Sequence, residues 1–259
     1  MPLSNSIITL TTDFGVRDGF PAAMYGVILS VNPQVRIVDL CHAIHPGDIA
    51  HGAYILTTVA PYFPAGTIHL AIVDPGVGTK RHILVLRTQE QVFIAPDNGL
   101  LGYILQQNPD AEVRYLENPK LWLEKPSFTF HGRDIMAPAA ARLAMGIPFS
   151  EVGPVANFWE PAPLPPMLKK EQYIQGYVIH IDHFGNLITN IPGEYTGTLT
   201  IRDHRIETRA QTFSDGTPGE PVMLVGSSGC LEIVVKEDSA ANLLKVSVGD
   251  TVNLMVNKM

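Results

Sequence analysis

The stretch IITLTTDFG, residues 7–15, joins a short apolar run directly to an acidic loop that ends in glycine. Short runs rich in β-branched residues are typical of buried strands in an α/β sheet. Residues 19–31 follow with the spacing of apolar side chains expected of a helix. A strand, a loop and a helix in this order predict a sheet with helices on its faces.

The same alternation continues to about residue 150. It predicts further strands at residues 35–40, 68–73, 83–86 and 92–95, and further helices at 48–59, 100–107 and about 135–145. Pro138 fits the last helix only within its first turn, because proline has no N–H to donate further along a helix. Residues 1–153 are therefore expected to form an α/β domain with a central, mostly parallel sheet.

Five prolines interrupt the chain between residues 154 and 166, and residues 154–170 are predicted to form a Pro-rich linker. Beyond it, short β-rich runs predict strands at residues 173–181, 197–201, 221–225, 231–235 and 251–256, with one short helix at 239–244. Closely spaced strands separated by turns are typical of small barrels. Residues 171–259 are therefore expected to form a smaller, β-barrel-like domain.

Composition narrows the class of protein. Of the 259 residues 46% are hydrophobic and the formal net charge is −7, which favours a globular fold and disfavours a nucleic-acid partner. The two cysteines lie far apart, as suits a reducing cytosol. The first six residues lack the basic start of a signal peptide, and no apolar run approaches the ~20 residues that span a bilayer. We expect a soluble, cytoplasmic protein with no membrane partner.

The loop after the first strand carries Asp13 and Asp18. In open α/β sheets ligands bind beyond the carboxyl ends of strands, and a carboxylate there can accept both hydrogen bonds of a ribose diol. Asp13 could equally cap the next helix, because aspartate is a favoured N-cap. The residues alone leave both interpretations open.

Two further segments carry candidate catalytic side chains. In DPGVGTKR, residues 74–81, a tight loop could fold Arg81 back onto Asp74, although an exposed ion pair of little consequence would also fit. In HGRD, residues 131–134, His131 lies at a helix N-terminus, where the neutral imidazole that can accept a proton is favoured. Gly132 would allow the backbone to approach a ligand closely, and a core or capping role for His131 stays open.

Two segments of the second domain combine polar and aromatic groups in turns. IDHFGNLITN, residues 181–190, could supply an anion, a stacking face and an amide through Asp182, Phe184 and Asn186. The turn VGSSG, residues 225–229, offers the hydroxyls of Ser227 and Ser228 and backbone N–H groups to a carboxylate. Either segment could also be an ordinary turn or bulge.

These five motifs, in this order and over nearly the whole chain, resemble the S-adenosylmethionine hydroxide adenosyltransferase family, whose relatives include fluorinating and chlorinating enzymes. The resemblance implies hydrolysis of S-adenosylmethionine to adenosine and methionine, and this chemistry requires no metal or other cofactor. It also implies a homotrimer whose ligand lies between the first domain of one subunit and the second domain of its neighbour.

The resemblance further assigns roles to residues. Asp74, Arg81 and His131 match the water-handling trio of the hydrolases. Asp13 matches the ribose-diol ligand, and Asp18 and Asp182 match carboxylates that face the methionine ammonium. The remaining matches surround the adenine, methionyl and adenosyl groups: Phe184, Asn186, Ser227, Ser228 and Glu232.

The subtype also follows from the resemblance. Halogenating members lack the trio, and fluorinating members carry serine at the position of Gly132 and an extra loop for which residues 81–92 leave no room. Residues 236–238, Lys-Glu-Asp, depart from the Asn and Gly usual there, which puts the fine adenine contacts in doubt. A halide adenosyltransferase and a non-catalytic adenosine-binding protein remain the alternatives. Scattered histidines such as His42 and His45 also make a metal-dependent phosphoesterase an alternative, although no cluster of carboxylates flanks them at ligand spacing.

Overall fold

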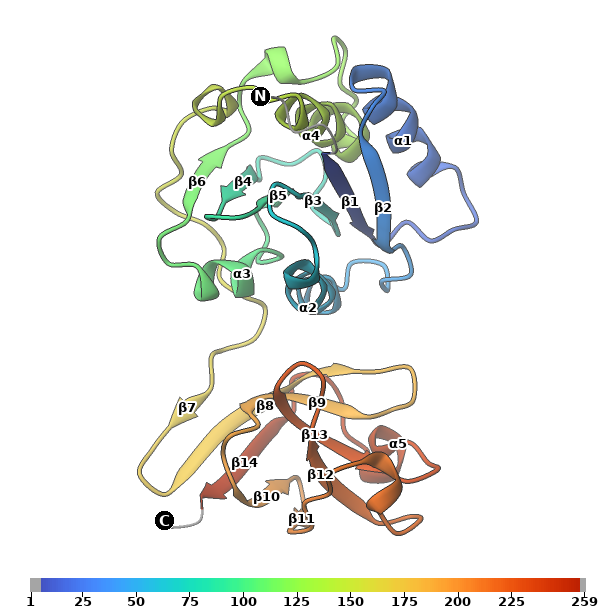
Figure 1. Ribbon diagram of the computed structural model, residues 1–259, viewed down its shortest axis with the longest axis vertical. Helices are drawn as coiled ribbons and strands as arrows, with labels where there is room; N and C mark the ends of the chain where they lie inside the picture. The colour runs from blue at the N-terminus through green and yellow to red at the C-terminus, as the bar shows by residue number, and fades with distance from the viewer. Residues whose placement is uncertain (1–5, 257–259) are drawn as a thin grey trace. The chain divides into compact units, whose positions relative to one another are not determined.

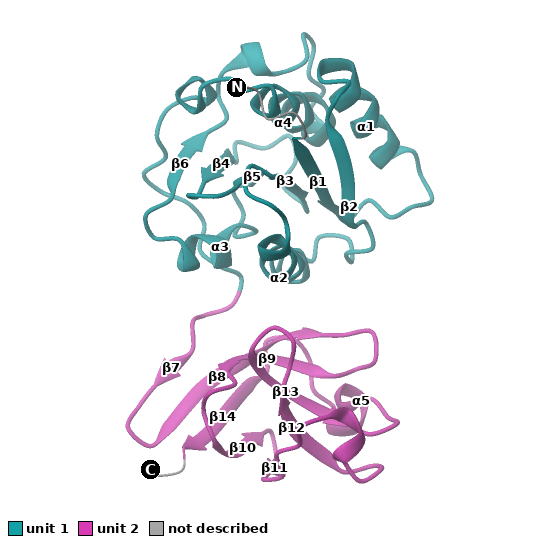
Figure 2. Ribbon diagram, in the orientation of Figure 1, with its two compact units in different colours: residues 1–163 teal, residues 164–259 magenta. Residues whose placement is uncertain are grey.

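The computed structural model describes residues 6–256 and divides the chain into two compact units, residues 1–163 and 164–259 (Figure 2). Residues 1–5 and 257–259 lie outside the described residues. The expectation that no signal peptide is present concerns the first of these segments. Each unit has its own hydrophobic core.

The first unit contains a six-stranded sheet in the order β2-β1-β3-β5-β4-β6 (Figure 1). Its strands are β1 (Ile7–Thr12), β2 (Arg36–Cys41), β3 (Ile68–Ile72), β4 (Ile83–Arg87), β5 (Val92–Pro96) and β6 (Glu112–Tyr115). The β1–β2, β1–β3 and β3–β5 pairs are parallel, whereas β4 runs antiparallel to both β5 and β6. The prediction of a mostly parallel sheet is confirmed, and β6 is an edge strand that the sequence analysis missed.

Helices cover both faces of this sheet (Figure 1). They are α1 (Phe20–Val31) and α4 (Ala137–Ala144) on one face, and α2 (Ile49–Val59) and α3 (Gly102–Gln107) on the other. Successive side chains of a strand point to opposite faces, so Leu70 packs with the α1–α4 core and Ala71 with the α2–α3 core. Within residues 6–256, none of the helices has the length and apolar character needed to span a bilayer.

The helix after HGRD begins earlier than predicted. A five-residue π-helix, η3 (Gly132–Met136), precedes α4, so helical backbone starts directly after His131. Pro138 lies in the first turn of α4, as its missing N–H requires. The carbonyl of Asp134, four residues earlier, accepts a hydrogen bond from the Leu123 N–H at 2.8 Å instead. The chain thereby satisfies the backbone group that proline leaves free.

The second unit is a barrel-like antiparallel sheet, as predicted, in the order β11-β10-β14-β8-β9-β13-β12 with β7 beside β8. Its elements are β7 (Leu168–Lys169), β8 (Tyr173–Ile181), β9 (Leu187–Pro192), β10 (Gly197–Ile201), β11 (His204–Ile206), β12 (Pro221–Val225), β13 (Cys230–Val235), α5 (Ala240–Leu244) and β14 (Thr251–Val256). A β-bridge between Arg209 and Met223 brings the segment after β11 to β12, at the opposite end of the strand order. The sheet therefore nearly closes around its core.

The first part of the Pro-rich segment is bonded to the first unit. The Ala156 N–H donates to the carbonyl of Val113 at 2.9 Å, and the Glu160 N–H donates to Oδ1 of Asp97 at 2.8 Å. The two units divide after Pro163. Residues 154–160 thus complete the edge of the first unit.

Candidate active site

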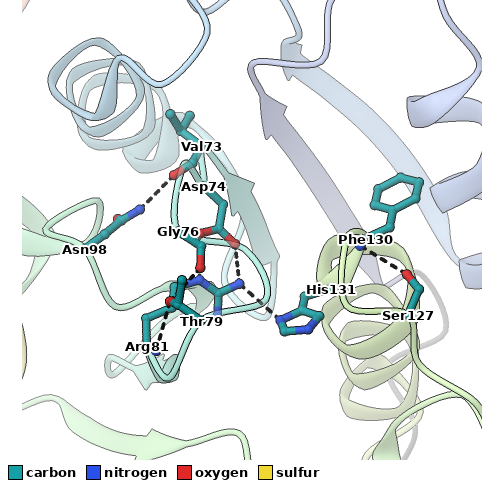
Figure 3. Close-up of polar contacts among 9 residues, drawn as sticks. All are labelled: Val73, Asp74, Gly76, Thr79, Arg81, Asn98, Ser127, Phe130 and His131. Atoms are coloured by element: carbon teal, nitrogen blue, oxygen red, sulfur yellow. Dashed lines mark hydrogen bonds and ion pairs between the residues drawn. The ribbon is translucent and has the colours of Figure 1, made fainter.

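Asp74, Arg81 and His131 lie together beyond the carboxyl end of β3 (Figure 3). Nε of Arg81 donates to Oδ1 of Asp74 at 2.6 Å, and its Nη2 donates to Oδ2. The same Nη2 lies 3.3 Å from Nδ1 of His131. The expected folding of Arg81 back onto Asp74 is confirmed, and His131 joins the pair from a segment fifty residues away.

The Asp74–Arg81 pair is buried. The side chains are 5% and 9% exposed, and both carboxylate oxygens are engaged by one guanidinium. Bidentate pairs of this kind fix geometry, and loss of either partner would leave an uncompensated buried charge. The alternative of an exposed ion pair of little consequence is therefore wrong.

The surroundings of His131 favour its neutral form. Burial, reinforced by the charge of Arg81, lowers the pKa of His131 below its ordinary 6.5 and outweighs the carboxylates of Asp74 and Asp134, which act in the other direction. A guanidinium can only donate hydrogen bonds, so a neutral His131 facing it presents the lone pair of Nδ1 and carries its hydrogen on Nε2. The basic atom of the ring therefore lies beside the guanidinium.

The Asp74 loop is anchored by a residue that the sequence analysis did not single out. Nδ2 of Asn98, from the loop after β5, donates to the carbonyl of Val73 at 2.8 Å, immediately before Asp74 (Figure 3). At the other end of the loop Gly78 has φ +79°, and a Cβ there would lie 2.4 Å from the Phe128 carbonyl oxygen. Only glycine allows the two loops to approach this closely.

The turn that presents His131 is held by buried Asp134. Oδ2 of Asp134 accepts from the Ser127 N–H at 2.8 Å. The Ser127 hydroxyl accepts from the Phe130 N–H at 3.1 Å (Figure 3). Burial acts to raise the pKa of Asp134, but hydrogen bonds from Arg133 and Ser127 hold it below its ordinary value. The ionised carboxylate thus ties the segment before His131 to the helix after it.

Gly132 is buried against the sheet. A Cβ at this position would lie 2.8 Å from Cδ1 of Ile72, so a side chain would push the start of the helix away from β3. This packing is a structural reason for glycine. The predicted contact between Gly132 and the substrate stays a prediction.

Asp13 does not cap α1. The N-cap of that helix is Gly19, which makes no side-chain cap, so the capping interpretation is wrong. Oδ2 of Asp13 instead accepts from the Gly47 N–H at 2.8 Å, and Oδ1 makes no hydrogen bond within residues 6–256. Asp18, farther along the same loop, is exposed. One oxygen of Asp13 is therefore free to accept from a diol.

In the second unit, Asp182 organises the loop between β8 and β9. Its Oδ1 accepts from the N–H groups of Phe184 at 2.9 Å and Asn186 at 2.8 Å, and its Oδ2 accepts from the Asn186 amide at 2.8 Å. The turn interpretation thus describes this segment correctly. The same turn leaves the Phe184 ring 75% exposed, as a stacking face would need to be.

Glu232 lies close enough to Asp182 for the two negative charges to interact. It is 7% exposed, and burial together with the Asp182 charge raises its pKa above the ordinary value. Neither carboxylate forms a salt bridge within the described part of the chain. Gly226 packs against the Glu232 side chain, and the exposed Ser227 and Ser228 complete the turn before β13.

The charged turn at residues 236–238 adjoins the Asp182 loop. A Cβ on Gly185 would overlap Ser239, and the Ala241 N–H donates to the Gly185 carbonyl at 2.9 Å. Within this turn Glu237 adopts φ +61°, a conformation that favours glycine or asparagine. The structure explains why Asn and Gly would be usual in this turn and shows that the chain tolerates a glutamate.

The histidines do not gather into a metal centre. Among residues 6–256 no three His, Cys, Asp or Glu side chains lie close enough together to hold a metal ion. His42 instead contacts Thr12, Tyr25 and Asp39, as described below. The phosphoesterase hypothesis therefore gains no ligand set from this part of the chain.

Comparisons with known proteins identify the family of this chain. Models of the N-terminal and C-terminal domains of S-adenosylmethionine hydroxide adenosyltransferase match residues 8–153 and 176–253. An (R)-S-adenosyl-L-methionine hydrolase from Salinispora arenicola is 40% identical, with 94% of this chain and 95% of that protein covered. A fluorinase from Actinoplanes sp. is 28% identical, with 96% and 97% covered.

A crystal structure of an uncharacterized conserved protein from Thermotoga maritima superimposes with a TM-score of 0.87 at 33% identity. The match covers 96% of this chain and 99% of that one. Both domain models and the relatives extend over almost the whole sequence. The chain belongs to the S-adenosylmethionine hydroxide adenosyltransferase family.

Proposed function

We propose that this enzyme hydrolyses S-adenosyl-L-methionine to adenosine and L-methionine. The oxygen of water forms a bond to C5′ as the C5′–S bond breaks, sulfur keeps the electron pair as a neutral thioether, and one proton is released. The observation that carries the proposal is the buried Asp74–Arg81 pair with neutral His131 beside it. The (R)-S-adenosyl-L-methionine hydrolases among its relatives support it.

In this mechanism the attacking water lies beside Nη2 of Arg81 and Nδ1 of His131, which are 3.3 Å apart, and within hydrogen-bonding distance of both atoms. The guanidinium stabilises the negative charge that develops on oxygen, and Nδ1 accepts the proton. Asp74 holds the guanidinium in place, so no reorganisation is needed as charge develops. Attack on carbon next to a sulfonium brings opposite charges together, which is favoured where water is excluded.

The substrate-binding roles extend the proposal. Asp13 binds the ribose diol through its free oxygen, and Asp18 and Asp182 face the methionine ammonium, with Glu232 adding a further negative charge. Phe184 stacks on adenine and Asn186 contacts it. Gly132, Ser227 and Ser228 approach the remaining adenosyl and methionyl atoms. The Asp13 oxygen that makes no hydrogen bond within residues 6–256, the proximity of the Asp182 and Glu232 carboxylates and the exposed ring of Phe184 support these roles.

The substrate epimer is part of the proposal. The relatives are named for (R)-S-adenosyl-L-methionine, and because "L" already fixes the amino-acid carbon, the (R) describes the sulfonium centre. We propose that this chain also prefers the (R) sulfonium. In-line attack fixes the direction in which the thioether leaves, so one epimer would fit the site better.

The test is incubation of the purified protein with each sulfonium epimer, with and without chloride or bromide, followed by chromatographic separation of the products. Adenosine and methionine under both salt conditions support hydrolysis. A 5′-halo-5′-deoxyadenosine peak would instead indicate the halide adenosyltransferase, which the fluorinases among the relatives make the second candidate. Tight adenosine binding with no turnover would indicate a binding protein.

We further propose a homotrimer with its sites between subunits. The candidate site residues are divided between two units of the chain, which supports this assembly. Mixing inactive Asp13→Ala subunits with inactive Asp182→Ala subunits should restore part of the activity, since some sites would then combine two intact contributions. No recovery after subunit exchange would show that each chain builds its own site.

The reaction as proposed needs neither a metal nor an organic cofactor, because the sulfonium is itself the activated leaving group. Full activity after treatment with a chelator would support this, and restoration by one added metal would oppose it. We also propose a cytoplasmic location, supported by two cysteines that are both free. Cell fractionation with a specific antibody tests it.

A further inference from the structure

A chain of polar side chains lies behind the Asp13 loop. Oγ1 of Thr12 lies 2.7 Å from Nδ1 of His42, and Nε2 of His42 lies 3.0 Å from Oδ1 of Asp39 and 3.2 Å from the Tyr25 hydroxyl. The Tyr25 hydroxyl donates to the other oxygen of Asp39. Thr12 and His42 are 0% and 8% exposed, so their polar groups depend on one another.

The donors and acceptors in this chain can be assigned. Burial and the adjacent Asp39 carboxylate raise the pKa of Tyr25, which keeps its proton and donates it to Asp39. Nε2 of His42 then faces only oxygen acceptors and carries a ring hydrogen. Nδ1 serves as the acceptor for the buried Thr12 hydroxyl, which has no other acceptor among the described residues. The Thr12 oxygen in turn accepts from the Phe14 N–H at 3.3 Å.

These hydrogen-bonded side chains hold the backbone on both sides of Asp13. Thr12 precedes Asp13 and bonds the His42 ring, while the Gly15 N–H donates to the His42 carbonyl at 2.8 Å. Gly47, five residues after His42, donates to the Asp13 carboxylate itself. One residue of the β2–α2 connection thus fixes the loop from which Asp13 projects.

We propose that His42 is a positioning residue for substrate binding: through Thr12 it holds Asp13 in the orientation that binds the ribose diol. His42 does not touch the substrate in this account. The inference rests on the diol-binding role proposed for Asp13. It adds that the affinity for adenosine depends on a hydrogen bond to the strand residue before Asp13.

Two histidine variants separate the two ends of the ring. In His42→Asn the amide oxygen can occupy the place of Nδ1 and accept from Thr12, whereas in His42→Gln the amide reaches only the place of Nε2. We expect His42→Gln to weaken adenosine binding about tenfold and His42→Asn to weaken it less than about threefold. The measurement is titration calorimetry with adenosine on the full-length protein.

Thr12→Val gives the second arm, because it keeps the shape of the side chain and removes the hydroxyl. We expect about a tenfold rise in the adenosine Kd and in KM for S-adenosylmethionine, with kcat changed less than about threefold. Thr9→Val is the matched control. Thr9 lies on the same strand and bonds Nδ1 of buried His69 at 2.8 Å, away from Asp13. It should lower the melting temperature similarly and leave Kd unchanged.

The outcomes are distinguishable. If Asp13→Asn weakens adenosine binding while Thr12→Val and His42→Gln do not, His42 is not a positioning residue and the proposed role of Asp13 stands. If Asp13→Asn leaves Kd unchanged, the role of Asp13 itself fails. Equal losses in His42→Asn and His42→Gln would also overturn the inference, because the bond to Thr12 would then not be the one that matters.

Discussion

The two units treat buried charge in opposite ways. In the first unit Asp74 and Arg81 neutralise each other in a bidentate pair, and the adjacent His131 is held neutral. In the second unit Asp182 and Glu232 place two carboxylates near each other with no cation in a salt bridge to either within residues 6–256. The charges of the first arrangement therefore balance without a substrate, whereas the second arrangement keeps an excess of negative charge.

This difference fits the two tasks that the reaction sets. Stabilising a developing hydroxide needs donors already fixed in place, which the paired guanidinium provides. Binding a substrate with an ammonium and a sulfonium needs negative charge without a resident partner, which the second unit provides. In the proposed mechanism the first unit performs the chemistry and the second binds the cationic substrate.

The largest expected effect is on turnover. His131→Ala should lower kcat by about 10²–10⁴-fold, the range for loss of a general base, and change the adenosine Kd far less. His204→Ala, which removes an exposed histidine of the second unit, is the control and should leave kcat unchanged. A kcat for His131→Ala within about a factor of two of the unmodified enzyme would show that His131 is not the base.

The pH profile sharpens the same assignment. Because burial and Arg81 lower the pKa of His131, neutral imidazole should persist below pH 6.5. We expect kcat/KM to be level through neutral pH and to fall about tenfold per pH unit only below an inflection that lies under 6.5. An inflection above 6.5 that disappears in His131→Gln would contradict the lowered pKa.

The free energy of unfolding should depend far more on the buried Asp74–Arg81 pair than on an exposed ion pair. Asp74→Asn leaves the buried Arg81 charge unpaired and should lower the free energy of unfolding by about 3 kcal/mol. Glu207→Gln weakens an ion pair with Arg205 whose side chains are 62% and 70% exposed, and should change the free energy of unfolding by less than about 1 kcal/mol. Denaturant titration measures both. Equal effects would mean that burial of the Asp74 pair does not matter.

Glu232→Gln should stabilise the folded protein at neutral pH, whereas Asp74→Asn should destabilise it. Since the folded protein raises the pKa of Glu232, the stability tied to its proton is present below the ordinary value of 4.5 and is lost as pH rises through the raised pKa. The variant should therefore melt above the unmodified protein at neutral pH, and the difference should vanish towards pH 4. Glu220→Gln, at an exposed carboxylate, is the control. A difference that is constant with pH would contradict the account.

The smallest expected effect is at Glu237. Replacing this residue by glycine relieves a positive φ but increases the entropy of the unfolded chain, so the net stabilisation should be at most about 1 kcal/mol. Glu220→Gly, at a residue without positive φ, should destabilise instead. If both variants destabilise alike, the strain at Glu237 is negligible.

Strand-and-loop patterning predicted the sheet and placed Asp13 and Asp74 directly after their strands. These positions follow from local sequence, because an apolar run and the loop after it are contiguous. The same pattern missed β6, a four-residue edge strand held in place by pairing with β4, which depends on tertiary contact. It also placed the last helix three residues late, since π-helical backbone before a proline has no simple periodicity.

The supporting residues of the site were harder to predict. Asn98 acts through one hydrogen bond to the backbone before Asp74, and Thr12 lies in a run that reads only as a strand. Asn98 lies 25 residues from its partner Val73, and Thr12 lies 30 residues from His42, so no local sequence motif predicts either hydrogen bond. The resemblance predicts which residues contact the substrate, whereas the hydrogen bonds that hold those residues follow from tertiary structure.

The most direct test of the central claim is hydrolysis in ¹⁸O-labelled water, with mass spectrometry of the isolated adenosine and methionine. Attack of water at C5′ predicts one ¹⁸O atom in the 5′-hydroxyl of adenosine and none in methionine, and this product should nearly disappear in His131→Ala. Unlabelled adenosine, or labelled adenosine formed equally fast by His131→Ala, would contradict the account.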